Sequence, residues 1–346
     1  MSKKLALYRI SILFLCHFGI DFICALAIYR NFAERYNAFL LYNFFAFALQ
    51  MPLGILIDAW TKKSRKTLLP GLVFTLAGIL ATIGGSFFSH IIMGVGNALF
   101  HVGGGVLTIH EDEDNGFKGK GFGVFVAPGA FGLSLGKALY DSPMFTLIQI
   151  IACVLLVVLG LLLFVKYEDR VFEQVGTDLK DKDLNYLIIL CFAVVFIRSL
   201  TGMGMSFSWN DSKLTSTLLS LSLSCGKSAG GFIAAKFGAK KTTLISLGFA
   251  AIAYIFADKM AFGLLASMFF NMTMPMTLFM LYRNMTDLPG FAFGILTFAL
   301  FIGYLPVLYG YIGNMSPFPF GTICCVVSLI MMLLGIAISD KRGVNG

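Results

Sequence analysis

Residues 54–66 read GILIDAWTKKSRK, and residues 231–241 read GFIAAKFGAKK. Both stretches begin with a glycine, continue through apolar residues and end in a cluster of basic residues. They start 177 residues apart (231 minus 54), which is close to half of the 346-residue chain. A motif that recurs after half of a chain indicates a parallel repeat, in which two halves share one topology.

The composition shows what kind of chain is repeated. Hydrophobic residues make up 58% of the chain and charged residues only 13%, and the mean hydropathy is +0.85. A soluble fold of this length cannot bury so much apolar surface, so the sequence predicts a polytopic membrane protein. Because a spanning helix needs about 20 apolar residues, the apolar runs predict twelve spans. They lie near residues 8–29, 37–58, 68–87, 90–110, 121–140, 143–166, 186–207, 213–235, 242–258, 261–282, 289–312 and 318–338.

Twelve spans and a repeat at half length define the expected fold class. We predict an all-α integral membrane protein with twelve transmembrane helices in two pseudo-symmetric six-helix halves. The N-terminal half covers residues 1–166, a cytoplasmic central linker covers 167–184, and the C-terminal half covers 185–346.

Basic residues fall unevenly on the loops between these spans. The termini, the linker and the even-numbered loops hold eighteen Lys and Arg, whereas the odd-numbered loops hold four. The positive-inside rule therefore places both termini in the cytoplasm, with the chain in an inner or plasma membrane. The net charge of +8 comes from these short clusters, not from a basic domain, which excludes nucleic acid and leaves the lipid bilayer as a partner.

The repeated loops resemble the signature G-x-L-x-D-R-x-G-R-K of the major facilitator superfamily. Gly54, Leu56 and Asp58 match it in the first half, and KFGAKK matches it in the second half, where Ala235 replaces the acid. The resemblance covers the whole chain and implies alternation between inward-open and outward-open states. It also implies that spans 1, 4, 7 and 10 line a central cavity and that the protein is a monomer.

Within that superfamily the chain is most similar to the fosmidomycin resistance family of exporters. The likeness lies in H-x-x-x-D of the first span, GVGNALFHVGGG of the fourth (residues 94–105) and FIRS of the seventh (residues 196–199). Where that family usually reads F-H-P-E, this chain has Val102 and Gly103 after His101.

The signature loops are the predicted conformational switch. An acid at a membrane-embedded helix end needs a positive partner, such as the N-terminus of a neighbouring helix, and we expect Asp58 to have one. Anchoring by the positive-inside rule explains the basic residues of the loop but not this acid. The predicted switch residues are Gly54, Asp58, Lys62, Lys63, Arg65, Lys236 and Lys240.

Ionisable residues in mid-span predict the functional site, because a charge at the bilayer centre costs about 2.5–3.5 kcal/mol. His17 and Asp21 lie four residues apart on one helical face, and the offset of 177 maps Asp21 onto Arg198. We expect His17 and Asp21 to form a protonatable pair that faces Arg198 across the cavity, with His101 in the fourth span nearby. The alternative is a static salt bridge between Asp21 and Arg198, with His17 as a donor between helices.

Three embedded cations, Arg198, Lys227 and Lys137, against one embedded acid favour an anionic substrate, although Lys137 is near enough to a span end to reach the interface. The tenth span carries methionines at every fourth position. They form an adaptable wall for an amphipathic solute, a path for Cu(I), or ordinary helix packing. These methionines are Met268, Met272, Met276 and Met280.

Other motifs predict structure and not chemistry. Pro128 and Gly129 predict a kink in the fifth span. The acidic run from Glu111 to Asp114 lacks the spacing of metal ligands and is interpreted as a solvated cytoplasmic loop. The seven cysteines show no metal-ligand spacing either.

These residues together predict a secondary active transporter that works by alternating access and exports a small anionic or amphipathic compound in exchange for protons. An uptake carrier, a soft-metal (copper) permease and a non-transporting membrane sensor are the alternatives. The sequence predicts no enzyme, no cofactor and no resident metal.

Overall fold

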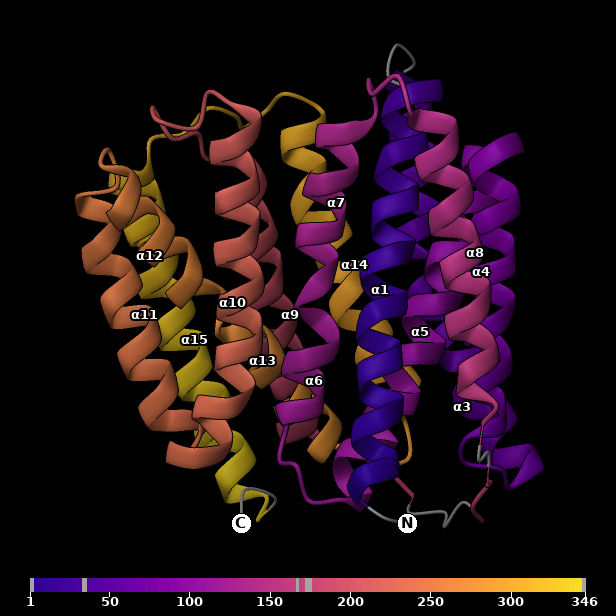
Figure 1. Cartoon of the computed structure of the whole chain (residues 1–346). Coiled ribbons are helices and arrows are strands. Elements are labelled where there is room, and N and C mark those ends of the chain that lie inside the picture. Colours follow the sequence, from indigo (N-terminus) through magenta and orange to yellow (C-terminus); the bar gives the residue numbers. More distant parts are fainter. Residues whose placement is uncertain (1–2, 33–35, 166–167, 172–175, 344–346) are drawn as a thin grey trace.

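The structure is a computed structural model that describes residues 3–32, 36–165, 168–171 and 176–343. Helices account for all the regular structure of this described part, apart from two isolated β-bridges (Figure 1). The elements are α1 (Lys3–Asn31), α2 (Tyr36–Asn43), the π-helix η1 (Phe44–Ala48), α3 (Gln50–Ser64), α4 (Leu69–Phe88), α5 (His90–Asp114), α6 (Lys120–Val126), α7 (Pro128–Leu139), α8 (Phe145–Leu163), α9 (Lys182–Gly204), α10 (Lys213–Phe237), α11 (Ala239–Ile255), α12 (Met260–Asn271), α13 (Thr273–Arg283), α14 (Pro289–Leu308), the π-helix η2 (Pro317–Gly321) and α15 (Thr322–Lys341).

The helices match the predicted spans in order and position. Eleven helical segments of the described chain are long and apolar enough to cross a membrane, among them α6 with α7 and α12 with α13. The ninth predicted span is α11, whose 17 residues rise only about 26 Å, slightly less than the hydrocarbon core of a bilayer. The predicted all-α membrane fold is confirmed.

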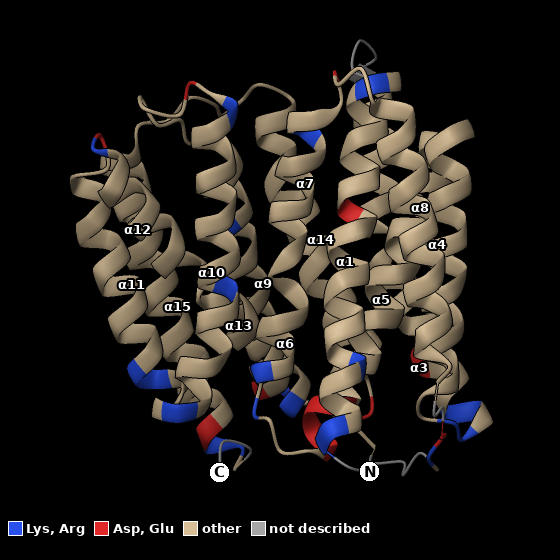
Figure 2. Ribbon diagram, viewed as in Figure 1, with Lys and Arg blue, Asp and Glu red and all other residues tan. Residues whose placement is uncertain are grey.

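In Figure 1, α1, α3, α4, α5 and α8 lie on one side of the bundle, α10, α11, α12 and α15 lie on the other, and α6, α7, α9 and α14 lie between them. The described residues begin and end at the same end of the bundle, which we call the N/C end. Lys and Arg gather at this end (Figure 2). The predicted half boundary at residues 166 and 167, and residues 172–175 of the linker, lie outside the described residues, so the division into 1–166 and 185–346 stays a prediction.

The predicted kink in the fifth span separates α6 from α7. α6 ends at Val126 and α7 begins at Pro128, whose ring removes a backbone donor at that point. After the kink, glycines bring α7 against the backbone of α1. A Cβ on Gly132 would lie 2.5 Å from the Phe18 carbonyl oxygen, and one on Gly136 would lie 2.4 Å from that of Phe22. Only glycine permits this approach.

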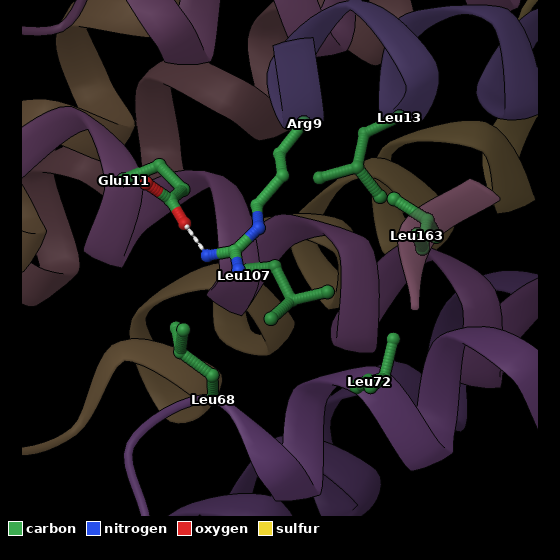
Figure 3. Close-up of a pocket in the computed structure, with 7 residues that line it drawn as sticks. All are labelled: Arg9, Leu13, Leu68, Leu72, Leu107, Glu111 and Leu163. Atoms are coloured by element: carbon green, nitrogen blue, oxygen red, sulfur yellow. Dashed lines mark hydrogen bonds and ion pairs between the residues drawn. The ribbon is translucent and has the colours of Figure 1, made fainter. Parts of the chain in front are cut away.

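The interpretation of the acidic run as a solvated loop is wrong for Glu111 and Asp112, whereas Glu113 and Asp114 are exposed at the end of the helix. α5 continues to Asp114, and Glu111 and Asp112 are each only 1% exposed. Glu111 pairs with Arg9 of α1 at 2.7 Å, beside a small leucine-lined pocket (Figure 3). Glu111 and Asp112 are buried because each has a partner: Asp112 accepts hydrogen bonds from the backbone of Gly119 and Gly121 at the start of α6, at 2.7 and 2.6 Å.

Candidate functional site

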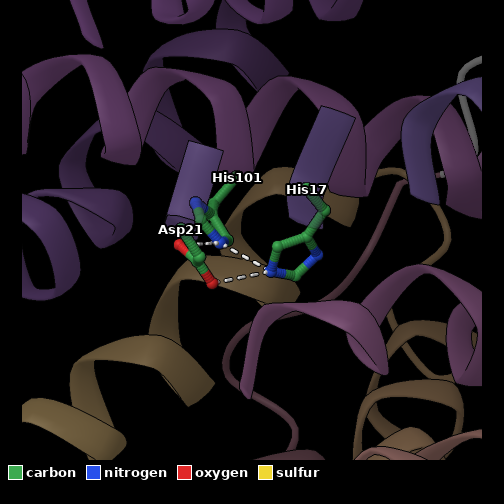
Figure 4. A group of neighbouring side chains, drawn as sticks. All are labelled: His17, Asp21 and His101. Carbon is green, nitrogen blue, oxygen red and sulfur yellow. Dashed lines mark hydrogen bonds and ion pairs between the residues drawn. The ribbon is translucent and has the colours of Figure 1, made fainter. Parts of the chain in front are cut away.

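His17, Asp21 and His101 meet between α1 and α5, and we call them the triad (Figure 4). His17 and Asp21 come from successive turns of α1, and His101 comes from α5. The His17 Nε2 atom lies 3.3 Å from Asp21 Oδ2, and His101 Nε2 lies 3.7 Å from Asp21 Oδ1. The two Nε2 atoms are 2.9 Å apart. All three side chains are buried.

The other ring nitrogens fix the tautomers of the two histidines. His17 Nδ1 lies 2.6 Å from the carbonyl oxygen of Phe125, and His101 Nδ1 lies 2.8 Å from that of Asn97. A carbonyl oxygen only accepts, so each Nδ1 carries the proton and donates it, which leaves both Nε2 atoms of the neutral rings as acceptors. Two nitrogen lone pairs and a carboxylate therefore converge on one point. Such a cluster of acceptors can take up a proton or a metal cation.

Two further residues complete the triad's surroundings. Asn97 donates to Asp21 Oδ1 at 3.0 Å, while its own buried side-chain oxygen has no hydrogen-bond partner within the described chain. Gly129, just after the α6–α7 kink, lies directly on the triad. A Cβ there would be 2.4 Å from Asp21 Oδ2 and 2.5 Å from His17 Nε2. The missing side chain leaves the room that the triad occupies.

The predicted pairing of Asp21 with Arg198 is wrong for this structure. No ion pair joins the two residues in the part of the chain that is described, and Arg198 of α9 instead donates to Thr273 Oγ1 of α13 at 3.4 Å. The reason is that Asp21 already has partners on α1 and α5: His17, His101 and Asn97 surround its carboxylate. Arg198 is only 5% exposed and has no carboxylate partner among the described residues.

The other predicted cations lie in different surroundings. Lys227 of α10 is half-buried, and within the described residues it has no acidic partner at ion-pair distance. Lys137 of α7 is exposed, with its Nζ 5.2 Å from the centre of the Tyr29 ring. The structure therefore brings Arg198 and the turn of α10 that holds Lys227 to the α12–α13 junction and leaves Lys137 exposed beside Tyr29.

The methionine stripe belongs mainly to the packing of the C-terminal half. Met272, Met276 and Met280 are 3–4% exposed, and Met268 is half-buried. Met280 contacts the position of Gly335 on α15, where a Cβ would be 3.2 Å from its methyl carbon. Ordinary helix packing accounts for these contacts.

The predicted switch loop joins the two sides of the bundle at the N/C end. Asp58 of α3 accepts hydrogen bonds from the backbone of Gly290 and Phe291, both at 2.8 Å, in the first turn of α14. Asp58 therefore has the helix N-terminus that its position was expected to require. Gly54 lies against Gly290, where a Cβ would be 2.1 Å from the carbonyl oxygen.

The basic residues of the switch divide into paired and exposed ones. Lys62 pairs with Asp287 at 2.9 Å, and Thr177 also hydrogen bonds to Asp287. The remaining predicted switch residues are exposed: Lys63, Arg65, Lys236 and Lys240.

Sequence reasoning missed Asn97, Gly129 and Asp287. The first two stand in stretches that looked like helix-packing glycine motifs, GVGNALFHVGGG and APGAFGLSLGK. A polar residue one turn before His101 was the available signal for Asn97. Nothing in the sequence placed Asp287 opposite Lys62, because the two are 225 residues apart.

Comparison with known proteins identifies the fold through solved structures and not through sequence. No protein-family model matches the chain, and no curated protein matches it in sequence. Solved structures do match over nearly the full length. The E. coli fucose:proton symporter FucP is 12% identical with a TM-score of 0.67 over 99% of both chains. The human organic anion transporter MFSD10 (TETRAN) is 13% identical with a TM-score of 0.66, covering 95% of this chain and 99% of its own.

A third structure, a bacterial homologue of the iron transporter ferroportin in an outward-facing state, is 13% identical with a TM-score of 0.60, over 99% of this chain and 100% of its own. A second structure of FucP, described as a major facilitator superfamily transporter in the outward conformation, has a TM-score of 0.61 at 13% identity, over 96% and 99% of the two chains. The chain therefore has the fold of major facilitator superfamily transporters.

Proposed function

We propose that the chain is a secondary active transporter that works by alternating access and exports a small anionic or amphipathic compound in exchange for protons. It acts as a monomer in an inner or plasma membrane, with the N/C end in the cytoplasm, and catalyses no chemical reaction. The export direction follows the resemblance to the fosmidomycin resistance family.

The observation that carries this proposal is the pair of cations in the C-terminal half. Arg198 donates to Thr273 at the start of α13, and the turn of α10 that holds Lys227 packs on the end of α12 through Gly226 and Gly230, so both cations come to the α12–α13 junction; neither has a carboxylate partner at ion-pair distance in the described chain. Two cations at mid-membrane depth repel each other and are costly to bury. An anion bound between them offsets both costs, so these residues are the proposed substrate site. The fold shared with an organic anion transporter agrees with this substrate class.

The triad is the proposed site of the coupling ion. Its three acceptor atoms lie close enough together to share one cation, and a proton is the smallest cation that they can bind. A transporter of the same fold is described as a fucose:proton symporter, which supports protons as the coupling ion.

Thermal stability of the purified protein tests the anion site, because a ligand that binds only the folded state raises the melting temperature. The ligands are phosphonates, phosphates, carboxylates and lipophilic cations. We expect anions to stabilise the wild type and to lose that effect in Arg198→Gln and Lys227→Gln. Lys137→Gln is the matched control, because Lys137 is exposed and apart from the site, and it should respond like the wild type.

Stabilisation by lipophilic cations alone, or anion stabilisation that survives Arg198→Gln, would contradict the proposal. Flux in proteoliposomes then separates a transporter from a sensor. A sensor binds the anion without moving it, whereas a proton-coupled exporter accumulates it against its gradient when a pH difference is imposed.

A further inference from the structure

We propose that His17, Asp21 and His101 form a binding site for a divalent transition-metal ion, represented by Zn²⁺. Each residue offers one donor atom, and these atoms all lie within 4.8 Å of one another (Figure 4). A tetrahedral zinc ion with bonds of about 2.0–2.1 Å holds its ligands about 3.3 Å apart. The two Nε2 atoms are 2.9 Å apart, and each lies near a different oxygen of the Asp21 carboxylate, His17 at 3.3 Å from Oδ2 and His101 at 3.7 Å from Oδ1, so small side-chain adjustments bring one donor atom from each residue to that spacing.

The hydrogen bonds around the triad are those of metal-binding histidines. A histidine that binds a metal through one ring nitrogen usually donates its other N–H to a carbonyl or a carboxylate, which fixes the ring and the tautomer. His17 and His101 both do this, through the carbonyl oxygens of Phe125 and Asn97. The Asn97 side chain in turn holds Asp21 at 3.0 Å. The ligands are therefore oriented before an ion arrives.

The chemistry of the donors selects the kind of ion. Imidazole nitrogen with carboxylate oxygen suits borderline ions such as Zn²⁺ and Co²⁺, whereas Cu(I) prefers thioether and thiolate sulfur. The metal site thus differs from the copper path suggested by the methionine stripe.

A metal ion and a proton are alternative occupants of the same lone pairs. Metal binding needs bare ring nitrogens and an ionised carboxylate, so an arriving ion releases any proton that the triad holds. The proposed function already makes the triad the site of the coupling ion, and the inference of a metal site rests on that proposed function. The anion site at Arg198 and Lys227 lies in the other half and can be tested separately.

Titration of the purified, metal-free full chain with Co²⁺ tests the site, because tetrahedral Co²⁺ has distinctive visible absorption that Zn²⁺ abolishes on displacing it. We expect one ion per chain. His17→Ala and His101→Ala should each weaken binding more than about 100-fold, since loss of an outer hydrogen-bond partner alone costs roughly 10–100-fold. Asn97→Ala should fall in that smaller range. His90→Ala, on the same helix as His101 but outside the triad, should bind like the wild type.

Gly129→Ala is a second test that leaves His17, Asp21 and His101 unchanged, in case the histidine variants fail to fold. Its methyl group would lie 2.4 Å from Asp21 Oδ2, so it should abolish Co²⁺ binding while the folded protein survives. No tetrahedral Co²⁺ signal in the wild type, or wild-type affinity in His101→Ala, would overturn the metal site. If the metal-free protein still responds to anions through Arg198, only the metal inference has failed; if Zn²⁺ binds the triad and no anion binds, the anion proposal has failed.

Discussion

Two contacts join the sides of the bundle at the N/C end, and they are built differently. In the first, α3 meets α14: Gly54 lies on Gly290, and the Asp58 carboxylate binds the first turn of α14. In the second, α10 meets α6: Gly231 lies on Gly119 and Gly123, where a Cβ would be 2.7 Å from the Gly119 carbonyl oxygen. The offset of 177 relates Gly54 to Gly231 and Asp58 to Ala235.

The difference separates two tasks that the repeated motif performs. Glycine occurs in both contacts, because backbone-to-backbone approach sets the geometry of closure. The carboxylate occurs in only one. At the second contact, the start of α6 is already bound by Asp112 from the same side of the bundle, so an acid at position 235 would find no unsatisfied helix N-terminus. One charged contact and one apolar contact therefore close the N/C end.

The largest expected effect comes from Gly54→Ala. Its Cβ would lie 2.1 Å from the Gly290 backbone, which cannot move as a flexible side chain does. Overpacking of this kind costs about 3 kcal/mol, which shifts the closed-to-open ratio roughly 100-fold. Spin labels on Lys63→Cys and Lys240→Cys, in a Cys225→Ser background, should report a longer distance across the N/C end.

Gly248→Ala is the control for that substitution, because nothing lies within 4 Å of its added Cβ in α11. It should leave the label distance unchanged. Gly231→Ala applies the same change to the second contact, where the nearest backbone oxygen is 2.7 Å away, and should open the bundle less than Gly54→Ala. An unchanged distance in Gly54→Ala would mean that the α3–α14 contact does not hold the N/C end closed.

Asp58→Asn should have the next largest effect. The amide keeps one acceptor oxygen but loses the charge that attracts the N-terminus of α14 and strengthens two hydrogen bonds. Together these contribute about 1.5 kcal/mol, so the open population should rise roughly tenfold. The same label pair measures it. A label distance like that of the wild type would show that the glycine contact alone is sufficient.

Much of this arrangement was predictable from the sequence. Hydropathy located a helix at each of the twelve predicted spans, eleven of them long and apolar enough to cross a membrane, because a membrane helix needs a long apolar run and little else. The half-chain repeat identified Gly54 and Asp58 as a pair of structural residues, and the rule that embedded acids need partners predicted a helix N-terminus at Asp58. In the triad, four-residue spacing placed His17 and Asp21 on one face.

The rest depended on which helices meet. Asp21 was expected to face Arg198 because the repeat relates them, but a repeat gives equivalent positions and not contacts. Glu111 and Asp112 looked solvated because their partners, Arg9 and the start of α6, are distant in the sequence or contribute only backbone groups. The sequence predicted no metal, since His17 and His101 lie 84 residues apart and show no ligand spacing.

Ala235→Asp places an acid in the α10–α6 contact at the position that corresponds to Asp58 in the α3–α14 contact. If the second contact lacks a carboxylate only because Asp112 already binds α6, the new acid gains no partner. Position 235 is half-buried, so the change should alter stability and the label distance little, within about 0.5 kcal/mol. The double change Asp112→Asn with Ala235→Asp asks whether the acid can replace Asp112. A marked tightening by Ala235→Asp alone would contradict the explanation.

The smallest effect concerns pH and the pair of Lys62 with Asp287. Burial raises the pKa of the Asp287 carboxyl, but hydrogen bonds from Thr177 and Lys62 outweigh it and hold the pKa below its ordinary value. A lowered folded-state pKa gives stability that is present above the unfolded value, about 3.9, and is lost as pH falls through the folded value. The contribution of Asp287 to the label distance should therefore be constant from pH 8 to pH 5.

Asp287→Asn removes the charge of this carboxylate, as strong acid would, and should widen the label distance less than Asp58→Asn does. The reason is that Asp287 binds the Lys62 side chain and Thr177 of the linker, whereas Asp58 binds the N-terminus of a helix. A pH dependence between 8 and 5 that vanishes in Asp287→Asn would show that this carboxyl titrates near neutrality, and would make the linker contact a pH-sensitive part of closure.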